Sequence, residues 1–377
     1  MNIIDLPLEI QIVSAVLLIS FVIQLYHLLF RVRNLAFYKQ GEVDNSFTPP
    51  VSVIICAKNE SINLTNFLPS ILNQDYPNFE VIVVNDGSED DTELVLSKFK
   101  QEHPHLYYTS IPIDKKFTHG KKLAVSIGIK AANNEHLVFT DADCYAATDQ
   151  WLKGMVSGFA KENKEIVLGF GAYKKEKGFT NFLIRYDTFY IAIQYLSYAL
   201  KRRPYMGVGR NLAYKKSLFT QNRGMSSHMH IASGDDDLFI SETASKTNTS
   251  IVVNPSAHTF SLGPQNLSRW KDQKSRHLTT AHYHKRRIKF SLFIEPFSRL
   301  FLIISAIFLI LINKFVIIVG SLVFLKYLIQ LILWRKISKL LNQGKLYWSL
   351  LFFDLLHPLF LLWAYLSSVR RNKNRWK

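Results

Sequence analysis

The chain has 377 residues, 48% of them hydrophobic, and carries a formal net charge of +17. This length leaves room for one large catalytic unit with appendages, and its two cysteines, Cys56 and Cys144, argue against a disulfide framework or a cysteine-based zinc site and fit a reducing compartment. No nucleic-acid-binding motif accompanies the positive charge, and basic residues flank apolar runs, so we expect a membrane partner and no nucleic acid.

Residues 1–48 are expected to form an N-terminal transmembrane anchor and a linker. The apolar run Ile10–Phe30 is about as long as the roughly 20 residues that span a bilayer. Asp5 and Glu9 precede it, which argues against a cleavable signal peptide. Arg31 follows it, so the positive-inside rule predicts an external N-terminus and a cytoplasmic segment after Arg31.

Residues 49–290 have the pattern of a soluble α/β domain. Continuous apolar runs predict buried strands at Val51–Ala57, Val81–Asn85 and His136–Thr140. Helical periodicity between the strands covers Leu64–Leu72, Thr92–Lys100 and Lys122–Ala132. This alternation predicts a parallel sheet with right-handed crossovers.

The aromatic-rich stretch Phe179–Leu200 has two interpretations. It contains Arg185 and Asp187 among apolar residues, which is typical of an amphipathic helix on the catalytic domain or at the bilayer interface. A core-facing helix accounts for the pattern equally well.

Residues 291–377 are expected to form a C-terminal transmembrane or interfacial region. The runs Leu300–Ile312 and Phe315–Trp334 predict a hairpin of two spans. The next apolar run, Leu346–Leu366, is interrupted by Asp354, His357 and Pro358. A full span here would place the basic tail, residues 370–377, outside, against the positive-inside rule. This run therefore either spans, re-enters or lies in the interface.

Polar residues follow each predicted strand, at the edge of the sheet where ligands bind in open α/β folds. Asn59 and Glu60 follow the first strand and Asp86 the second. Asp86 is placed to accept hydrogen bonds from a base or ribose, although a simple Asp-Gly turn gives the same pattern. Asp141 and Asp143 follow the third strand, and their spacing lets both carboxylates face one Mg or Mn ion. The alternative for this pair is a solvated acidic turn.

Three further charged positions suggest chemistry. Lys121 opens a predicted helix, which suits a phosphate or is an ordinary surface lysine. Asp235 and Asp236 lie in the run 234–238, where neighbouring carboxylates raise one another's pKa, as a general base requires, or cap a helix. Arg276 offers bidentate contacts to a pyrophosphate or belongs to a basic stretch beside the membrane. His277, His282 and His284 lack a fourth ligand, so we expect no metal there.

Together these motifs resemble, in order, those of the family 2 glycosyltransferases of the GT-A fold over about residues 50 to 280. The matching positions are Asn59 and Glu60 after the opening strand, Asp86, the glycine-lysine pair at Lys121, the DxD motif at Asp141 and Asp143, the acceptor-side segment with Gly209, Arg210 and Asn211, the ED-x-D-L element at 234–238, and the QxxRW motif at Gln273 and Arg276. Two positions depart from the pattern. Gly234 replaces the glutamate of the ED element, and His277 replaces the tryptophan of QxxRW.

The resemblance implies a GT-A, Rossmann-like mixed sheet that transfers a sugar, with inversion, from a nucleotide-diphosphate sugar, with UDP as the expected carrier. It implies that Asp235 is the base, or Asp236 if the element is aligned as Gly-Asp-Asp, and that Asp143 and Asp141 hold Mg or Mn. The nucleotide-sugar site would comprise Ala57, Asn59, Glu60, Asp86, Lys121, Asp141, Gln273 and Arg276. The acceptor side would comprise Gly209, Arg210, Asn211 and His277.

Three functions follow from this resemblance and remain open. The first is a non-processive transferase for a lipid, lipid-linked or saccharide acceptor, which the few spans and His277 favour because histidine has a smaller stacking face than tryptophan. The second is a processive polysaccharide synthase whose C-terminal spans line an export channel, with the polar interruption at 354–358 as its supporting feature. The third is a membrane scaffold that binds nucleotide without turnover.

Overall fold

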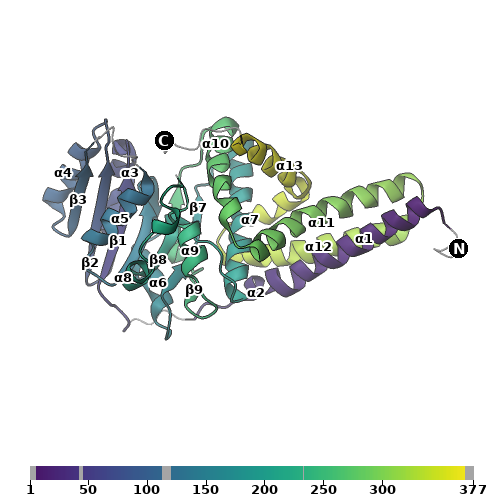
Figure 1. Ribbon diagram of the computed structural model, residues 1–377, viewed down its shortest axis with the longest axis horizontal. Coiled ribbons are helices and arrows are strands. Elements are labelled where there is room, and N and C mark those ends of the chain that lie inside the picture. Colours follow the sequence, from purple (N-terminus) through teal and green to yellow (C-terminus); the bar gives the residue numbers. More distant parts are fainter. Residues whose placement is uncertain (1–5, 42–45, 113–119, 232, 370–377) are drawn as a thin grey trace. The chain divides into compact units, whose positions relative to one another are not determined.

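The computed structural model describes residues 6–369, except for residues 42–45, 113–119 and 232. Two compact units are present: a helical unit of residues 1–38 and 285–366, and a catalytic unit built mainly from residues 39–284. Figure 1 shows the strands in the catalytic unit and long helices in the other. The three-part domain division at residues 48 and 290 stays a prediction, and the basic tail 370–377 lies outside the described residues.

A seven-stranded mixed sheet forms the centre of the catalytic unit. Its strand order is β3 (Leu106–Ile111), β2 (Phe79–Asp86), β1 (Val51–Ala57), β4 (His136–Asp141), β8 (Leu212–Lys215), β6 (Ile166–Leu168) and β9 (Thr249–Ile251). The strands β1 to β4 are mutually parallel, whereas β8 runs antiparallel to both β4 and β6. The three strands expected from the sequence are confirmed as β1, β2 and β4, and the mixed sheet agrees with the expected fold class.

Apolar sequence accounts for the position of β1 at the centre of the sheet. All seven of its residues are buried, as expected of a parallel strand covered on both faces. The helices α3 (Ser61–Leu72), α4 (Thr92–Glu102) and α5 (Lys121–Ala131) follow β1, β2 and β3 and confirm the expected alternation. Helix α5 packs closely on the sheet, since a Cβ at Gly128 would lie 2.7 Å from Cγ2 of Ile54.

A three-stranded sheet joins distant parts of the catalytic unit. Its order is β5 (Cys144–Ala146), β10 (Thr259–Ser261) and β7 (Gly171–Tyr173). Strand β5 comes directly after the Asp141–Asp143 segment, so the small sheet fixes the C-terminal end of that segment. The remaining helices of the unit are α6 (Trp151–Val156), α7 (Phe179–Leu200), α8 (Lys216–Gln221), α9 (Asp237–Thr243) and α10 (Leu267–Leu278).

Helix α7 is a core helix. It covers the predicted stretch Phe179–Leu200, and most of its side chains are buried within the catalytic unit. Its Asp187 forms a buried ion pair with Lys274 of α10, at 2.8 Å from Nζ to each carboxylate oxygen. The core-facing interpretation is therefore the one the structure supports.

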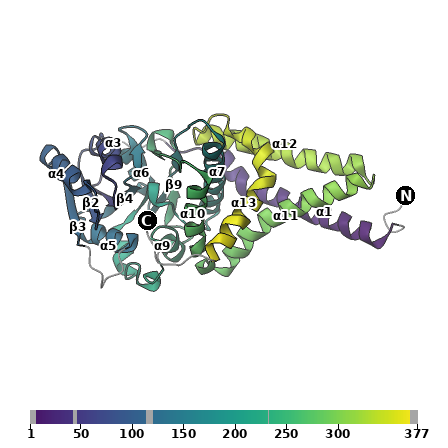
Figure 2. The same cartoon turned by 90° about the horizontal axis from the view of Figure 1, so that it is seen from above.

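The helical unit consists of four long apolar elements. Helix α1 (Leu8–His27) continues through a π-helical turn (Leu28–Val32) into α2 (Arg33–Ala36), and α11 (Arg286–Leu311), α12 (Val316–Leu340) and α13 (Leu350–Val369) follow from the C-terminal part of the chain. Four helices, over residues 8–36, 286–311, 316–340 and 346–367, are long and apolar enough to cross a membrane. Figure 2 shows α1, α11 and α12 lying along one another, in agreement with their mutual contacts.

A buried polar cluster lies inside the helical unit. Asp354 of α13 accepts hydrogen bonds from Arg299 of α11 at 2.7 Å and from Lys326 and Gln330 of α12 at 2.6 and 3.0 Å. These contacts give Asp354 opposite charges from two helices, so the polar interruption of the last apolar run is satisfied by its neighbours.

Candidate active site

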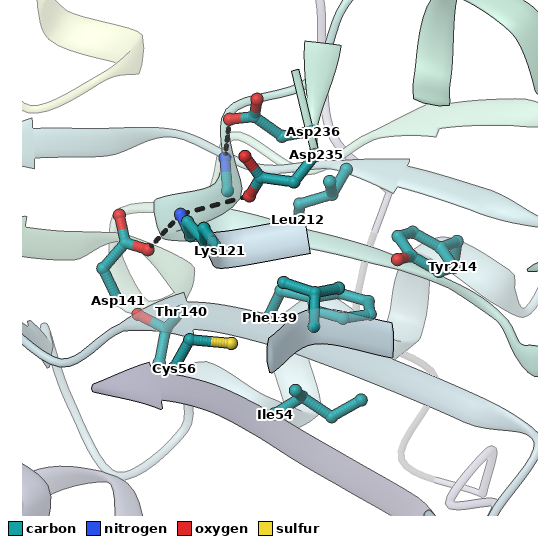
Figure 3. Close-up of a pocket in the computed structure, with 12 residues that line it drawn as sticks. Ile54, Cys56, Lys121, Phe139, Thr140, Asp141, Leu212, Tyr214, Asp235 and Asp236 are labelled. Atoms are coloured by element: carbon teal, nitrogen blue, oxygen red, sulfur yellow. Dashed lines mark hydrogen bonds and ion pairs between the residues drawn. The ribbon is translucent and has the colours of Figure 1, made fainter. Parts of the chain in front are cut away.

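The candidate site lies where the carboxyl ends of β1 and β4 meet the beginnings of α5 and α9. Its enclosed part has a volume of only about 20 Å³, and its lining includes Cys56, Lys121, Asp141, Gly209, Asp235 and Asp236. Figure 3 shows the side chains of Asp141, Lys121 and Asp235 converging there. The edge of the sheet thus brings together charged residues that lie far apart in the sequence.

Lys121 links the two acidic elements of the site. Its Nζ atom lies 2.7 Å from Oδ1 of Asp141 and 3.2 Å from Oδ2 of Asp235. Burial alone would lower the pKa of Lys121, but the attraction of Asp141, Asp235 and Asp236 raises it well above its usual value. Burial alone would raise the pKa of Asp141, but the Lys121 ammonium lowers it. Lys121 is therefore charged and holds Asp141 ionised.

Asp235 and Asp236 are adjacent but face different partners. Asp236 caps α9, because its Oδ1 accepts from the Asp237 N–H at 2.7 Å. Its Oδ2 accepts from the Gly209 N–H, in a different segment, at 2.7 Å. Asp235 instead turns toward Lys121 and the pocket (Figure 3). Burial, followed by repulsion from Asp235 and Asp237, raises the pKa of Asp236 to about 7. One run of acids thus serves both expected purposes, a helix start and a charge in the site.

Asp141 and Asp143 form the best candidate metal site among the described residues. Ligand atoms of Asp141, Asp143 and Cys144 lie within 4.8 Å of one another. The Cys144 thiol contacts Oδ1 of Asp143 at 3.5 Å, and burial raises its pKa well above the usual value. A protonated thiol is a poor metal ligand, so the donors are the two carboxylates, which fit a hard cation such as Mg or Mn. The three histidines, 277, 282 and 284, do not form such a group in the described part of the chain.

The loops after β1 and β2 are tied together on the expected nucleotide side. The Asn59 N–H donates to Oγ of Ser88 at 2.8 Å, and Oδ1 of Asn59 accepts from the Glu89 N–H at 2.8 Å. Asn59 has a positive φ of 55°, a conformation that asparagine tolerates better than most residues. The structure therefore uses Asn59 to position this loop pair.

The other expected nucleotide-side residues are more buried than Asn59. Ala57 and Asp86 are fully buried at the ends of β1 and β2. The Glu60 N–H donates to Oγ1 of Thr92 at 2.9 Å, while its carboxylate accepts from the Asn63 amide at 2.5 Å. Ala57 can contact a ligand only through its backbone, and Glu60 shapes the start of α3.

Arg210 lies at the centre of the expected acceptor side. Its guanidinium lies 4.3 Å from the centroid of the Tyr173 ring and donates to Oγ of Ser261 at 3.0 Å. Its carbonyl accepts from Thr140 at 3.0 Å and from Thr259 at 2.8 Å. The Tyr173 hydroxyl in turn lies 3.1 Å from Nε2 of Gln273. Gln273 is therefore joined to Arg210 through a stacked tyrosine.

Asn211 and His277 differ sharply in exposure. The Asn211 side chain is buried and makes hydrogen bonds with Trp151, Phe170 and Ala257 at 3.0, 3.0 and 2.8 Å, so it fixes the backbone of the segment that carries Gly209 and Arg210. His277 is exposed on α10. Arg276 of the same helix contributes to lowering the pKa of Asp141, which places its charge near the site.

Several site residues carry no motif in the sequence. Tyr173 and Ser261 come from the small sheet, and Asp187 from the core helix α7. Their roles depend on contacts between residues that are distant in the chain. Lys274 lies within the QxxRW-type element, but only the structure shows that it is buried and paired with Asp187.

The comparisons with known proteins agree with this geometry. Residues 52–223 match the model of the family described as Glycosyl transferase family 2. The poly-beta-1,6-N-acetyl-D-glucosamine synthase of Staphylococcus epidermidis is 32% identical over 114 residues, which is 30% of this chain and 26% of that enzyme. The glycosyltransferase AglE of Haloferax volcanii is 33% identical over 146 residues, which is 38% of this chain and 46% of the relative. The matches thus span less than half the length of these curated relatives.

A solved structure shares the fold. The mannosyltransferase PcManGT from Pyrobaculum calidifontis, in complex with GDP-Man and Mn2+, has a TM-score of 0.61 and 16% identity, over 96% of this chain and 99% of that one. At this identity the likeness concerns the fold alone. The family match covers β1 to β4, Lys121, both aspartates of the DxD segment and Arg210. Residues 52–223 are therefore similar in sequence to the family described as Glycosyl transferase family 2, and the chain shares its fold with a solved mannosyltransferase.

Proposed function

We propose that this protein is a membrane-bound, inverting glycosyltransferase that transfers a sugar from a nucleotide-diphosphate sugar, with UDP as the carrier, to a lipid or lipid-linked acceptor. The observation that carries the proposal is the placement of the Lys121 ammonium between Asp141 and Asp235. Asp141 on the donor side and Asp235, the candidate base, then lie on either side of one ammonium group. A positive charge in this position suits the diphosphate of a sugar nucleotide. The catalytic unit faces the cytoplasm, because Arg31, Arg287 and Arg335 flank the apolar helices.

The donor binds across the ends of β1, β2 and β4. The Ala57 backbone and Asp86 orient the nucleotide, with Asn59 and Glu60 fixing the loops around it. Lys121, Gln273 and Arg276 meet the diphosphate, where charge develops as the bond to the sugar breaks. Asp141 and Asp143 would hold a divalent cation, which would supply further positive charge to the leaving diphosphate.

Asp235 acts as the base in this proposal. It faces the pocket, whereas both oxygens of Asp236 already accept backbone N–H groups. Asp235 takes the proton from the acceptor hydroxyl as that oxygen attacks the anomeric carbon, so the carbon–oxygen bond to the diphosphate breaks while the new one forms. This displacement needs positioning and charge stabilisation and no covalent enzyme intermediate. Gly209, Arg210, Asn211 and His277 belong to the acceptor side.

A processive polysaccharide synthase is the second candidate. The match to a poly-beta-1,6-N-acetyl-D-glucosamine synthase favours it. Two features argue for the simpler transferase. His277 has a smaller stacking face than the tryptophan it replaces, and the paired carboxylate of Asp354 does not present a free polar group to a channel.

The deciding experiment measures transfer of radiolabel from a panel of UDP- and GDP-sugars into membranes that contain the full chain. Wild type is compared with Asp235→Asn and with Asp149→Asn, an exposed aspartate that does not line the pocket. We expect one donor to label an organic-extractable product, and we expect the label to be lost in Asp235→Asn and on chelation but kept in Asp149→Asn. Label in a long insoluble polymer would establish the synthase instead, and no label with any donor would overturn the enzymatic proposal.

A further inference from the structure

The helical unit contains a groove of its own between α1 and α11. Its volume is about 430 Å³, within the range of roughly 300–1,000 Å³ that small-molecule sites occupy. Apolar side chains form one stretch of the lining: Val22, Ile23, Phe290 and Ile294. The groove therefore offers apolar surface to a ligand that can enter from between two membrane-type helices.

Two arginines lie at one end of this groove. The Gln24 amide donates to the Glu295 carbonyl at 2.8 Å and to Oγ of Ser298 at 2.9 Å, which fixes the antiparallel register of α1 and α11. Arg31 lies about two turns beyond Gln24, and Arg287 lies about two turns before Glu295. Both guanidinium groups thus belong to the same end of the groove, and like charges brought together favour an anion between them.

A buried histidine adds a second observation. His27 lines the groove and is only 9% exposed, and its Nδ1 atom has no hydrogen-bond partner among the described residues. Buried polar atoms are nearly always paired in native proteins, so an unpaired one on a residue that lines a groove indicates a missing ligand. Glu295 also lines the groove, and its carboxylate lies 3.7 Å from the Arg299 guanidinium, which offsets its negative charge.

The backbone of the first helix is irregular at the same place. The π-helical turn Leu28–Val32 carries Arg31. Single π turns inside α-helices occur often at functional sites, because the extra residue redirects the side chains of that turn. The deviation from α-helical geometry thus coincides with the charged end of the groove.

We propose that this groove binds an anionic phospholipid of the bilayer. The phosphate lies between Arg31 and Arg287 within reach of His27, and one acyl chain lies along Val22, Ile23, Phe290 and Ile294. A soluble anion would leave the apolar part of the groove exposed to water, and an uncharged lipid would offer no negative charge to the two arginines of the lining. This lipid binding does not rest on the proposed sugar transfer, because every lining residue of the groove belongs to the helical unit.

The test uses the purified full chain in a zwitterionic detergent and a phosphatidic acid probe with a photoreactive group on one acyl chain. We expect cross-links to peptides of α1 and α11, competed by unlabelled phosphatidic acid and not by phosphatidylcholine with the same chains. The double variant Arg31→Gln/Arg287→Gln should bind the probe at least tenfold more weakly.

A matched pair serves as the control. The variant Arg33→Gln/Arg286→Gln removes the same charge from the same two segments at exposed positions that do not line the groove, and it should label like wild type. His27→Leu keeps both arginines and should lower labelling without changing monodispersity of the purified protein. Equal competition by unlabelled phosphatidic acid and phosphatidylcholine, or an equal loss of labelling in both arginine pairs, would overturn the proposal.

Discussion

Each unit contains a cluster of basic and acidic side chains, and the two clusters differ in their access to solvent. In the catalytic unit the side chains of Lys121, Asp141 and Asp235 are 21%, 28% and 12% exposed. In the helical unit those of Arg299, Lys326 and Asp354 are 1%, 0% and 1% exposed. The same chemistry therefore has two uses: a partly exposed ion pair can exchange a protein partner for a ligand, whereas a fully buried one can only hold helices together.

The largest expected effect is on catalysis by the partly exposed cluster. We expect Asp235→Asn to reduce kcat by roughly 10²–10⁴-fold, the usual contribution of a general base, with little change in the melting temperature. Transfer assays under single-donor conditions, combined with thermal unfolding, measure both quantities. A larger activity loss in Asp236→Asn than in Asp235→Asn would assign the base to Asp236.

A substitution in the buried cluster of the helical unit should reduce stability and leave donor binding unchanged. Asp354→Ala removes the buried carboxylate that Arg299 and Lys326 share, and the loss of one partner of a buried ion pair typically costs about 3–5 kcal/mol. We expect a lower melting temperature in detergent and reduced yield. In the protein that does fold, donor affinity should be normal, and a selective loss of donor binding would show that the cluster belongs to a substrate path.

Substitution of Lys121 tests whether the cluster in the catalytic unit binds the nucleotide sugar. Lys121→Met removes the cation that Asp141 and Asp235 share, so we expect nucleotide-sugar affinity to fall about tenfold or more, as for the loss of one charge-assisted contact. Titration calorimetry with the donor and with the free nucleoside measures this effect. Equal weakening of both ligands would mean that Lys121 does not contact the diphosphate.

A further effect concerns the pH dependence of stability. The pKa of Asp236 is raised to about 7 in the folded protein, so the folded state binds this proton more tightly than the unfolded state. Its stabilising contribution is complete below the unfolded pKa, near 4, and is lost as the pH rises through 7, by at most about 4 kcal/mol. We expect the melting temperature of wild type to fall between pH 4 and pH 7 more than that of Asp236→Asn. Parallel profiles would contradict this assignment.

Local sequence determined much of the fold. The runs that became β1, β2 and β4 are continuous and apolar, so their burial on both faces required no knowledge of their neighbours. The apolar runs within α1, α11, α12 and α13 were also legible, because a membrane-type helix satisfies its own backbone. Helix α11, however, begins at Arg286, well before the predicted run Leu300–Ile312. The polar residues at the strand ends followed from the parallel sheet, whose carboxyl ends share one edge.

Tertiary contacts decided what the charged residues do. Nothing near Lys121 in the sequence indicates Asp235 as a partner, and only the packing of α5 and α9 at the same sheet edge brings them to 3.2 Å. The stacking of Arg210 on Tyr173 and the ion pair of Lys274 with Asp187 likewise join elements that are distant in the chain. In the sequence, Asp354 interrupts an apolar run. In the structure, Arg299 and Lys326 supply the opposite charges that pair with it. Local periodicity and burial are properties of a segment, whereas the partner of a charge is a property of the folded chain.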